Sequence, residues 1–115
     1  MLKRNIFEYL AIHYIHIFTG NIIKEIIKFN HFDYLKLLVK HHLNINEKDK
    51  DGNTPLANAI IYKKHRMTTY LINRGANLHS INYNNETIYD QCLKNSKDYY
   101  GKTILHRVKR LLYNQ

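Results

Sequence analysis

The segment DKDGNTPLANAIIYKKHRMTTYLINRGANLHSI, from Asp49 to Ile81, decides the fold, because it has the features of a turn followed by two antiparallel helices. Gly52 suits a tight turn, since a residue without a β-carbon accepts left-handed backbone angles. Thr54 is placed to cap the first helix, and Pro55 follows at the first helical position, where its missing N–H costs nothing. Gly75 then ends the second helix as a left-handed C-cap.

Apolar residues recur at helical spacing between these signals. In the first helix they are Leu56, Ala59 and Ile60, and in the second they are Met67, Tyr70, Leu71 and Ile72. Because these positions repeat along the chain, we expect Leu56, Ala59, Leu71 and Ile72 to be nearly fully buried.

The same pattern returns when the segment is shifted by 33 residues in either direction. Shifted backwards, the apolar positions fall on Ile23, Ile26, Ile27, Leu37, Leu38 and Val39. Shifted forwards, Thr54 falls on Thr87 and Ala59 falls on Cys92. A period held over three copies predicts stacked units at residues 21–48, 49–81 and 82–115, of which the first and third are degenerate.

DGNTPLANA and LINRGANLH resemble the ankyrin repeat, and the resemblance extends from about residue 20 to residue 112. The chain departs from the family pattern at Ala57, where the family has His, and at His42, where the family has Gly. His42 must therefore adopt a left-handed conformation or reshape its turn. The resemblance implies an all-α, ankyrin-type repeat solenoid of about three helix-turn-helix units with terminal capping helices.

The two capping helices are expected at the ends of the chain. Residues 1–20 are predicted to be an N-terminal capping helix, whose apolar stripe would be Ile6, Phe7, Leu10, Tyr14, Ile17 and Phe18. A last helix from Thr103 to Tyr113 is predicted to be the C-terminal cap, with Lys102, His106, Lys109 and Arg110 on the face opposite its apolar residues. Alternatively, YGKTILH begins a fourth, truncated repeat.

Composition narrows the class of protein. The 115 residues indicate one domain, and the net charge of +9 favours acidic partners. The single cysteine, Cys92, excludes an internal disulfide and indicates a reducing compartment, the cytoplasm of the producing cell or of a host cell after export. No window approaches the roughly 20 apolar residues that span a bilayer, so a soluble protein is expected.

The sequence offers little support for catalysis. Gly101-Lys102-Thr103 resembles the end of a phosphate-binding loop, but Ser96 stands where that loop needs its first glycine. The pair His13 and His16 has no further ligands at metal-binding spacing. Cys92 occupies a small-residue position of an inner helix and is expected to be a buried packing residue. We therefore predict a non-enzyme without cofactor or metal.

The resemblance implies that partners bind the concave side, which is formed by turn tips and inner helices. The positions that it assigns to partner contacts are Lys50, Asp51, Asn53, Ile61, Tyr62, Arg74, Tyr83, Asn84, Glu86, Lys94, Asn95, Lys28, Phe29 and His41. Because Tyr and Arg supply many interface hot spots, Tyr62 and Arg74 are expected near the centre. The predicted function is a rigid protein–protein interaction module that acts as a monomer on an unidentified, acidic protein partner.

Two other interpretations stay open. Lys102, Lys109 and Arg110 on the last helix can instead bind nucleic acid or an anionic membrane, or the chain is a degenerate fragment without a partner. Ile, Asn, Lys and Tyr are abundant and have A/T-rich codons, so part of the lysine excess reflects an AT-rich genome. An isolated ankyrin array of this composition is similar to proteins of intracellular bacteria and large DNA viruses, which implies a host protein as partner.

Overall fold

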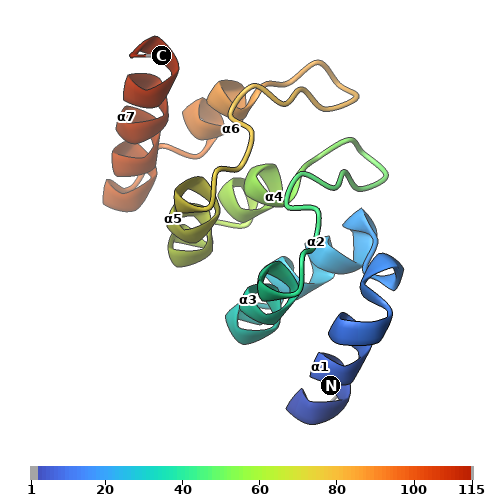
Figure 1. The fold of residues 1–115 in the computed structure, drawn as a ribbon. Coiled ribbons are helices and arrows are strands. Elements are labelled where there is room, and N and C mark those ends of the chain that lie inside the picture. The colour runs from blue at the N-terminus through green and yellow to red at the C-terminus, as the bar shows by residue number, and fades with distance from the viewer. Residues whose placement is uncertain (1–2, 115) are drawn as a thin grey trace.

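The computed structural model describes residues 3–114; residues 1–2 and 115, at the ends of the two expected capping segments, lie outside the described residues. Over the described part the chain is helical, without a strand, apart from an isolated bridge between Ile81 and Thr87. The elements in Figure 1 are α1 (Arg4–His13), a short 3-10 helix η1 (Ile15–Ile17), α2 (Gly20–Lys28), α3 (Phe32–Lys40), α4 (Pro55–Ile61), α5 (His65–Asn73), α6 (Ile88–Lys94) and α7 (Tyr99–Tyr113).

The helices form two rows (Figure 1). The inner row consists of α2, α4 and α6, in which each helix packs against the next. The outer row contains α1, α3, α5 and α7, and each inner helix packs against the outer helix that follows it in the chain. Phe32 of α3 and Tyr70 of α5 meet edge to face with their ring centroids 5.4 Å apart, which joins two outer helices. This arrangement confirms the predicted all-α repeat solenoid.

The 33-residue period is visible in the backbone itself. Among residues 3–114, six have left-handed φ angles, and they form three pairs that are each 33 positions apart: Asn30 with Lys63, His42 with Gly75, and Gly52 with Asn85. His42 therefore takes the left-handed conformation, with φ of 71°. Glycine adopts such angles without a steric cost and asparagine tolerates them, so the backbone strain falls mainly on His42 and Lys63.

The predicted helix signals and core positions are confirmed. The Thr54 side chain accepts a hydrogen bond from the Ala57 N–H at 3.3 Å, and Pro55 begins α4. Leu56, Ala59 and Leu71 have no exposed surface, and Ile72 is 9% exposed. Their equivalents Ile23, Ile26, Leu38 and Cys92 are buried as well, as are Ile27 and Leu37 of the first repeat. Val39, the equivalent of Ile72, and Tyr89, the equivalent of Leu56, are only half-buried.

The N-terminal segment differs from its prediction. The single helix expected over residues 1–20 ends at His13, where Tyr14 leaves the helical region with φ of −138°. Ile6, Tyr14 and Ile17 are exposed rather than part of a buried stripe. Of the predicted stripe, Phe7 and Phe18 are buried and Leu10 is partly buried, and Ala11, which was not predicted, is buried too. The Phe7 ring stacks on Tyr34 of α3 at 4.0 Å. Two buried residues four apart suffice for so short a helix, and the 3-10 turn brings Phe18 back to the Phe7 ring, at 5.2 Å.

The C-terminal helix also differs from its prediction. It begins at Tyr99 rather than Thr103, because the Asp98 carboxylate caps it by accepting a hydrogen bond from the Gly101 N–H at 2.6 Å. As a consequence α7 is the outer helix of the third repeat, paired with α6, and YGKTILH does not start a fourth repeat. The expected two faces are present. Ile104 and Val108 are buried, and Lys102, His106, Lys109 and Arg110 are exposed.

Candidate functional site

The first loop tip is held by one buried carboxylate. Asp49 is 4% exposed, and its Oδ1 accepts hydrogen bonds from the N–H groups of Asp51 at 2.9 Å and Asn53 at 3.0 Å. Its Oδ2 accepts a third from Asn58 Nδ2 of α4 at 3.0 Å. The predicted contact residues Lys50 and Asp51 are therefore exposed at the tip of a turn that is fixed to an inner helix.

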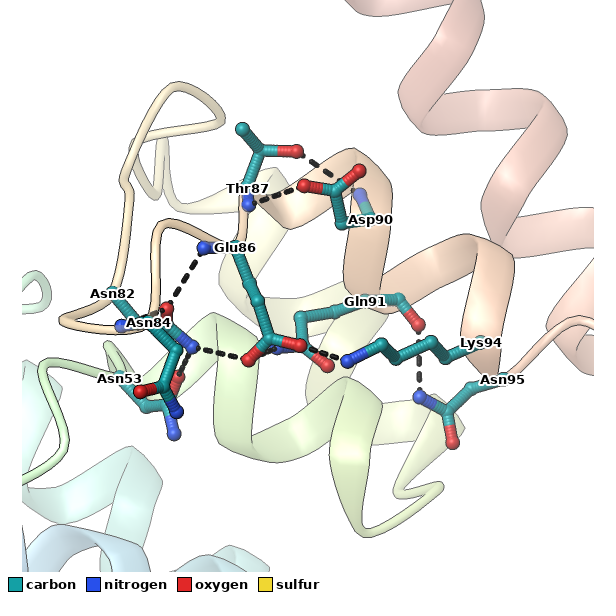
Figure 2. Close-up of polar contacts among 9 residues, drawn as sticks. All are labelled: Asn53, Asn82, Asn84, Glu86, Thr87, Asp90, Gln91, Lys94 and Asn95. Carbon is teal, nitrogen blue, oxygen red and sulfur yellow. Dashed lines mark hydrogen bonds and ion pairs between the residues drawn. The ribbon is translucent and has the colours of Figure 1, made fainter.

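The second loop tip repeats this turn 33 residues later with an amide in place of the carboxylate (Figure 2). Asn82 Oδ1 accepts from the N–H groups of Asn84 and Glu86, both at 2.9 Å. Asn82 Nδ2 donates to Asn53 Oδ1 and to Glu86 Oε1, again both at 2.9 Å. The Glu86 carboxylate also accepts a hydrogen bond from Gln91 and forms an ion pair with Lys94, so its contacts are with residues of its own repeat.

The tips are tied to each other as well as to their helices. The Tyr83 N–H donates to the Asp51 carbonyl at 3.0 Å, and Lys48 Nζ donates to the Ile81 carbonyl at 3.0 Å. Gly52 permits this approach, because a β-carbon there would lie 2.7 Å from the Tyr83 nitrogen. Tyr83 itself stays 69% exposed, and Asn84 is also exposed. These two predicted contact residues are thus presented to solvent on a backbone held by hydrogen bonds.

The inner helices contribute a second group of predicted residues. Phe29 follows the end of α2 and is 61% exposed, whereas Ile61 and Tyr62, at the end of α4, are half-buried. Lys28 Nζ lies 5.6 Å from the Phe29 ring centroid and 5.8 Å from that of Tyr62. The structure therefore brings Phe29 and Tyr62 together around one lysine, on the inner row.

Arg74 lies elsewhere than Tyr62. Its guanidinium lies over the ring of Tyr70 at 5.2 Å, and Tyr70 belongs to the outer helix α5. Tyr62, in contrast, ends the inner helix α4. Of the other predicted residues, Asn53 is half-buried and its side chain bonds Asn82, so it joins the two tips.

An apolar hollow on α2 was not predicted. It has a volume of about 520 Å³ and is lined by Phe7, Phe18, Ile22, Glu25, Ile26, Phe29 and His31. Thirty-three residues later, Ile22, Glu25 and Ile26 correspond to Pro55, Asn58 and Ala59, which are all buried, and α2 packs against α4. The hollow is thus the position in the inner row that a preceding inner helix would fill. Sequence reasoning missed it because it assumed that residues 1–20 cover this end.

The residues that we considered for catalysis or metal binding occupy structural positions in the helices. Cys92 is 1% exposed, and burial raises the pKa of its thiol to about 11, which keeps it protonated at neutral pH. Gly101-Lys102-Thr103 lies within the first turns of α7, not in a loop after a strand. Over residues 3–114 we find no group of three or more His, Cys, Asp or Glu side chains able to hold a metal, and no helix long and apolar enough to cross a membrane.

Stacked helix pairs, joined by loops that repeat the same turn, define a helical repeat solenoid. Residues 23–72, from the inner helix α2 to the outer helix α5, match the family model for ankyrin repeats in many copies. The chain therefore contains ankyrin repeats, as its sequence predicted. No curated protein matches the chain. Ankyrin repeats are generally protein–protein interaction modules, and the family is typically non-enzymatic.

Proposed function

We propose that this chain is a non-catalytic module that binds a protein partner through its loop tips and inner helices. The observation that carries the proposal is the presentation of exposed aromatic side chains on a fixed backbone. Tyr83 is 69% exposed on hydrogen-bonded tips, and Phe29 is 61% exposed at the end of α2. A rigid aromatic group loses little conformational entropy on binding, so such residues make effective anchors.

Polar and charged neighbours add specificity to this surface. Lys50, Asp51 and Asn84 are exposed at the two tips, and Tyr62 adds part of its ring beside Lys28. The net charge of +9 favours an acidic partner. We further propose that the protein acts as a monomer in a reducing compartment, the cytoplasm of the producing cell or of a host, where its buried Cys92 stays a thiol.

The test compares two double variants as bait in quantitative affinity capture from lysates of the producing or host cell. Phe29→Ala/Tyr83→Ala removes the proposed anchors, and Tyr99→Ala/Tyr113→Ala removes two equally exposed tyrosines of α7 as a matched control. A partner should be captured by the wild type and the control and lost with the first variant. Equal loss with both variants, or retention with both, would refute the proposed surface.

The alternative function uses the last helix. Lys102, Lys109 and Arg110 are exposed on α7, so they are accessible to phosphate or lipid headgroups. This alternative requires binding of generic RNA, DNA or anionic liposomes that falls steeply with salt and is lost in Lys102→Glu/Lys109→Glu/Arg110→Glu. We favour the protein partner, since ankyrin repeats are generally protein–protein interaction modules, and we expect that triple variant to leave partner capture intact.

A further inference from the structure

A basic cleft opens at the edge of the molecule that lies away from the loop tips. The outer helices α1, α3, α5 and α7 all begin near this edge, since residues from the first turn of each line one cleft of about 740 Å³. Arg4 comes from α1, Phe32 from α3, Arg66 from α5 and Tyr100 from α7. The connection between α4 and α5 adds Lys63 and Lys64. Sequence reasoning placed none of these residues together, because they are up to about a hundred positions apart.

The charge of the cleft is strongly unbalanced. Arg4, Lys63, Lys64 and Arg66 carry permanent positive charge, and the lining has one carboxylate, Asp33. Across residues 3–114 the ion pairs join Lys24 with Asp51, His65 with Asp98, and Lys94 with Glu86. None of the four cations of the cleft is therefore neutralised by a carboxylate of the described chain. Close packing of like charges is unfavourable in the absence of an anion.

Helix capping points in the same direction. The N-cap residues of the inner helices α4 and α6 are Thr54 and Thr87, whose side chains accept hydrogen bonds from the first turn. The N-cap residues of the outer helices α3 and α5 are His31 and Lys64, neither of which provides a side-chain cap. A helix start has free N–H groups and a positive dipole end, so a lysine there opposes helix stability. The same combination attracts an external anion.

We propose that this cleft binds an acidic segment of a protein partner, with its carboxylates facing Arg4, Lys63, Lys64 and Arg66. The inference rests on the proposed function, because it takes the partner to be a protein. Aromatic contacts argue against a single-stranded nucleic acid as the occupant. The Phe32 ring already has Lys36 Nζ at 4.3 Å and the Arg66 guanidinium at 5.3 Å, and Tyr100 stacks on His65 at 5.0 Å. Bases need free ring faces on which to stack, whereas carboxylates need only the cations.

The decisive variant separates binding from folding. Lys63→Gly removes a charge and places glycine at a residue with φ of 57°, and Lys64→Asp reverses a charge and supplies a preferred N-cap to α5. Both changes should stabilise the fold. Lys109→Gln/Arg110→Glu on α7 changes the net charge of the protein by the same amount and is the matched control.

The probe is a fluorescein-labelled Glu-rich peptide, measured by fluorescence anisotropy against its Gln-for-Glu counterpart, oligo-dT and vesicles of phosphatidylserine. We expect the wild type and the control to bind the Glu-rich peptide, and Lys63→Gly/Lys64→Asp to bind it about tenfold more weakly while melting at a higher temperature. Equal binding of the Gln counterpart, unchanged affinity in the cleft variant, or preference for oligo-dT or vesicles would overturn the inference.

The outcome is independent of the loop-tip surface. Phe29→Ala/Tyr83→Ala should bind the Glu-rich peptide as the wild type does, because both residues lie outside the cleft lining. Loss of partner capture without loss of peptide binding is therefore the expected result, with the tips and the cleft acting as two separate surfaces. Loss of peptide binding in Phe29→Ala/Tyr83→Ala would contradict the separation of the two sites.

Discussion

Replacing Gly75 by alanine measures the cost of a left-handed residue without interference from packing. Gly75 has φ of 83°, and a β-carbon built on it meets no atom within 4 Å. The left-handed conformation costs a non-glycine residue roughly 1–2 kcal/mol. Alanine also stabilises the fold by roughly 0.4–1 kcal/mol, because it lowers the conformational entropy of the unfolded chain. The free energy of unfolding should therefore fall by about 1 kcal/mol, which lowers Tm by about 4 °C in a domain of this size.

Two further variants make the comparison quantitative. His42→Gly is the reverse change at the equivalent residue of the preceding repeat, where φ is 71°, and should raise the free energy of unfolding by about 1 kcal/mol. Gly20→Ala tests crowding instead, since its β-carbon would overlap the backbone carbonyl of Lys48, and should cost about 3 kcal/mol or more. Urea unfolding followed by circular dichroism gives all three values. The reasoning is refuted if Gly75→Ala is as stable as the wild type, or if Gly20→Ala is the milder of the two alanine variants.

Three other predictions concern the core and the turns. Leu71→Ala should cost about 2–5 kcal/mol, as a large-to-small change at a fully buried position, and a Tm within a degree or two of wild type would contradict it. Asp49→Ala should lower the free energy of unfolding by more than about 2 kcal/mol, because it leaves the buried Asn58 amide and the N–H groups of the first tip without their acceptor. Urea unfolding would measure this loss, with Asp51→Ala, at an exposed carboxylate, as the control. Cys92 should resist a thiol reagent at pH 8 until the protein unfolds. Fast labelling of the native protein would contradict this prediction. Because burial raises the pKa of the Cys92 thiol to about 11, the thiol's contribution to stability should be full below the pKa of about 9 of the unfolded thiol, and it should be lost as the pH rises toward 11.

The repeat architecture could be predicted from sequence because its signals are local. Thr54 and Pro55 mark the start of a helix within a few residues, and Leu56, Ala59 and Leu71 recur at a fixed interval. Each of these features depends only on residues that are close in the chain. Comparing segments 33 positions apart then shows that the same set of features repeats. The same comparison, with Gly75 as the equivalent residue, left two possibilities for His42, a left-handed conformation or a reshaped turn, and the structure shows the first.

The ends of the chain were predicted less well, because their structure depends on tertiary contacts. Helical spacing placed Ile6, Phe7 and Tyr14 on one stripe, but the packing of α1 against α3 selects Phe7 and leaves the other two exposed. The start of α7 was placed four residues late, because the cap at Asp98 follows a connection one residue longer than those in the other repeats. An aspartate three residues before Gly101 was the signal available for it.

The proposed binding surfaces likewise include residues that could be predicted from sequence and residues that could not. Lys50, Asp51, Tyr83 and Asn84 were predicted from their places in the repeat, and the structure exposes all four. Tyr62 and Arg74 were predicted to lie together near the centre of the surface. They do not, because Tyr62 belongs to the inner row and Arg74 packs on the outer helix α5. The hollow on α2 and the basic cleft are formed by residues far apart in sequence. Neither is marked by a local sequence pattern, so neither could be predicted without the structure.

The turns at Asp49 and Asn82 have one further consequence, at the level of the gene. Both are closed by the same pair of backbone hydrogen bonds to a side-chain oxygen, at positions 33 residues apart. Recombination between the DNA segments that encode them would remove or duplicate one whole repeat in frame. The new neighbours would then meet through surfaces of the same kind as α2 and α4 use now. Duplication can thus lengthen the array in whole repeats over evolution, whereas removal of a repeat from this array would leave fewer than the three that a stable stack needs.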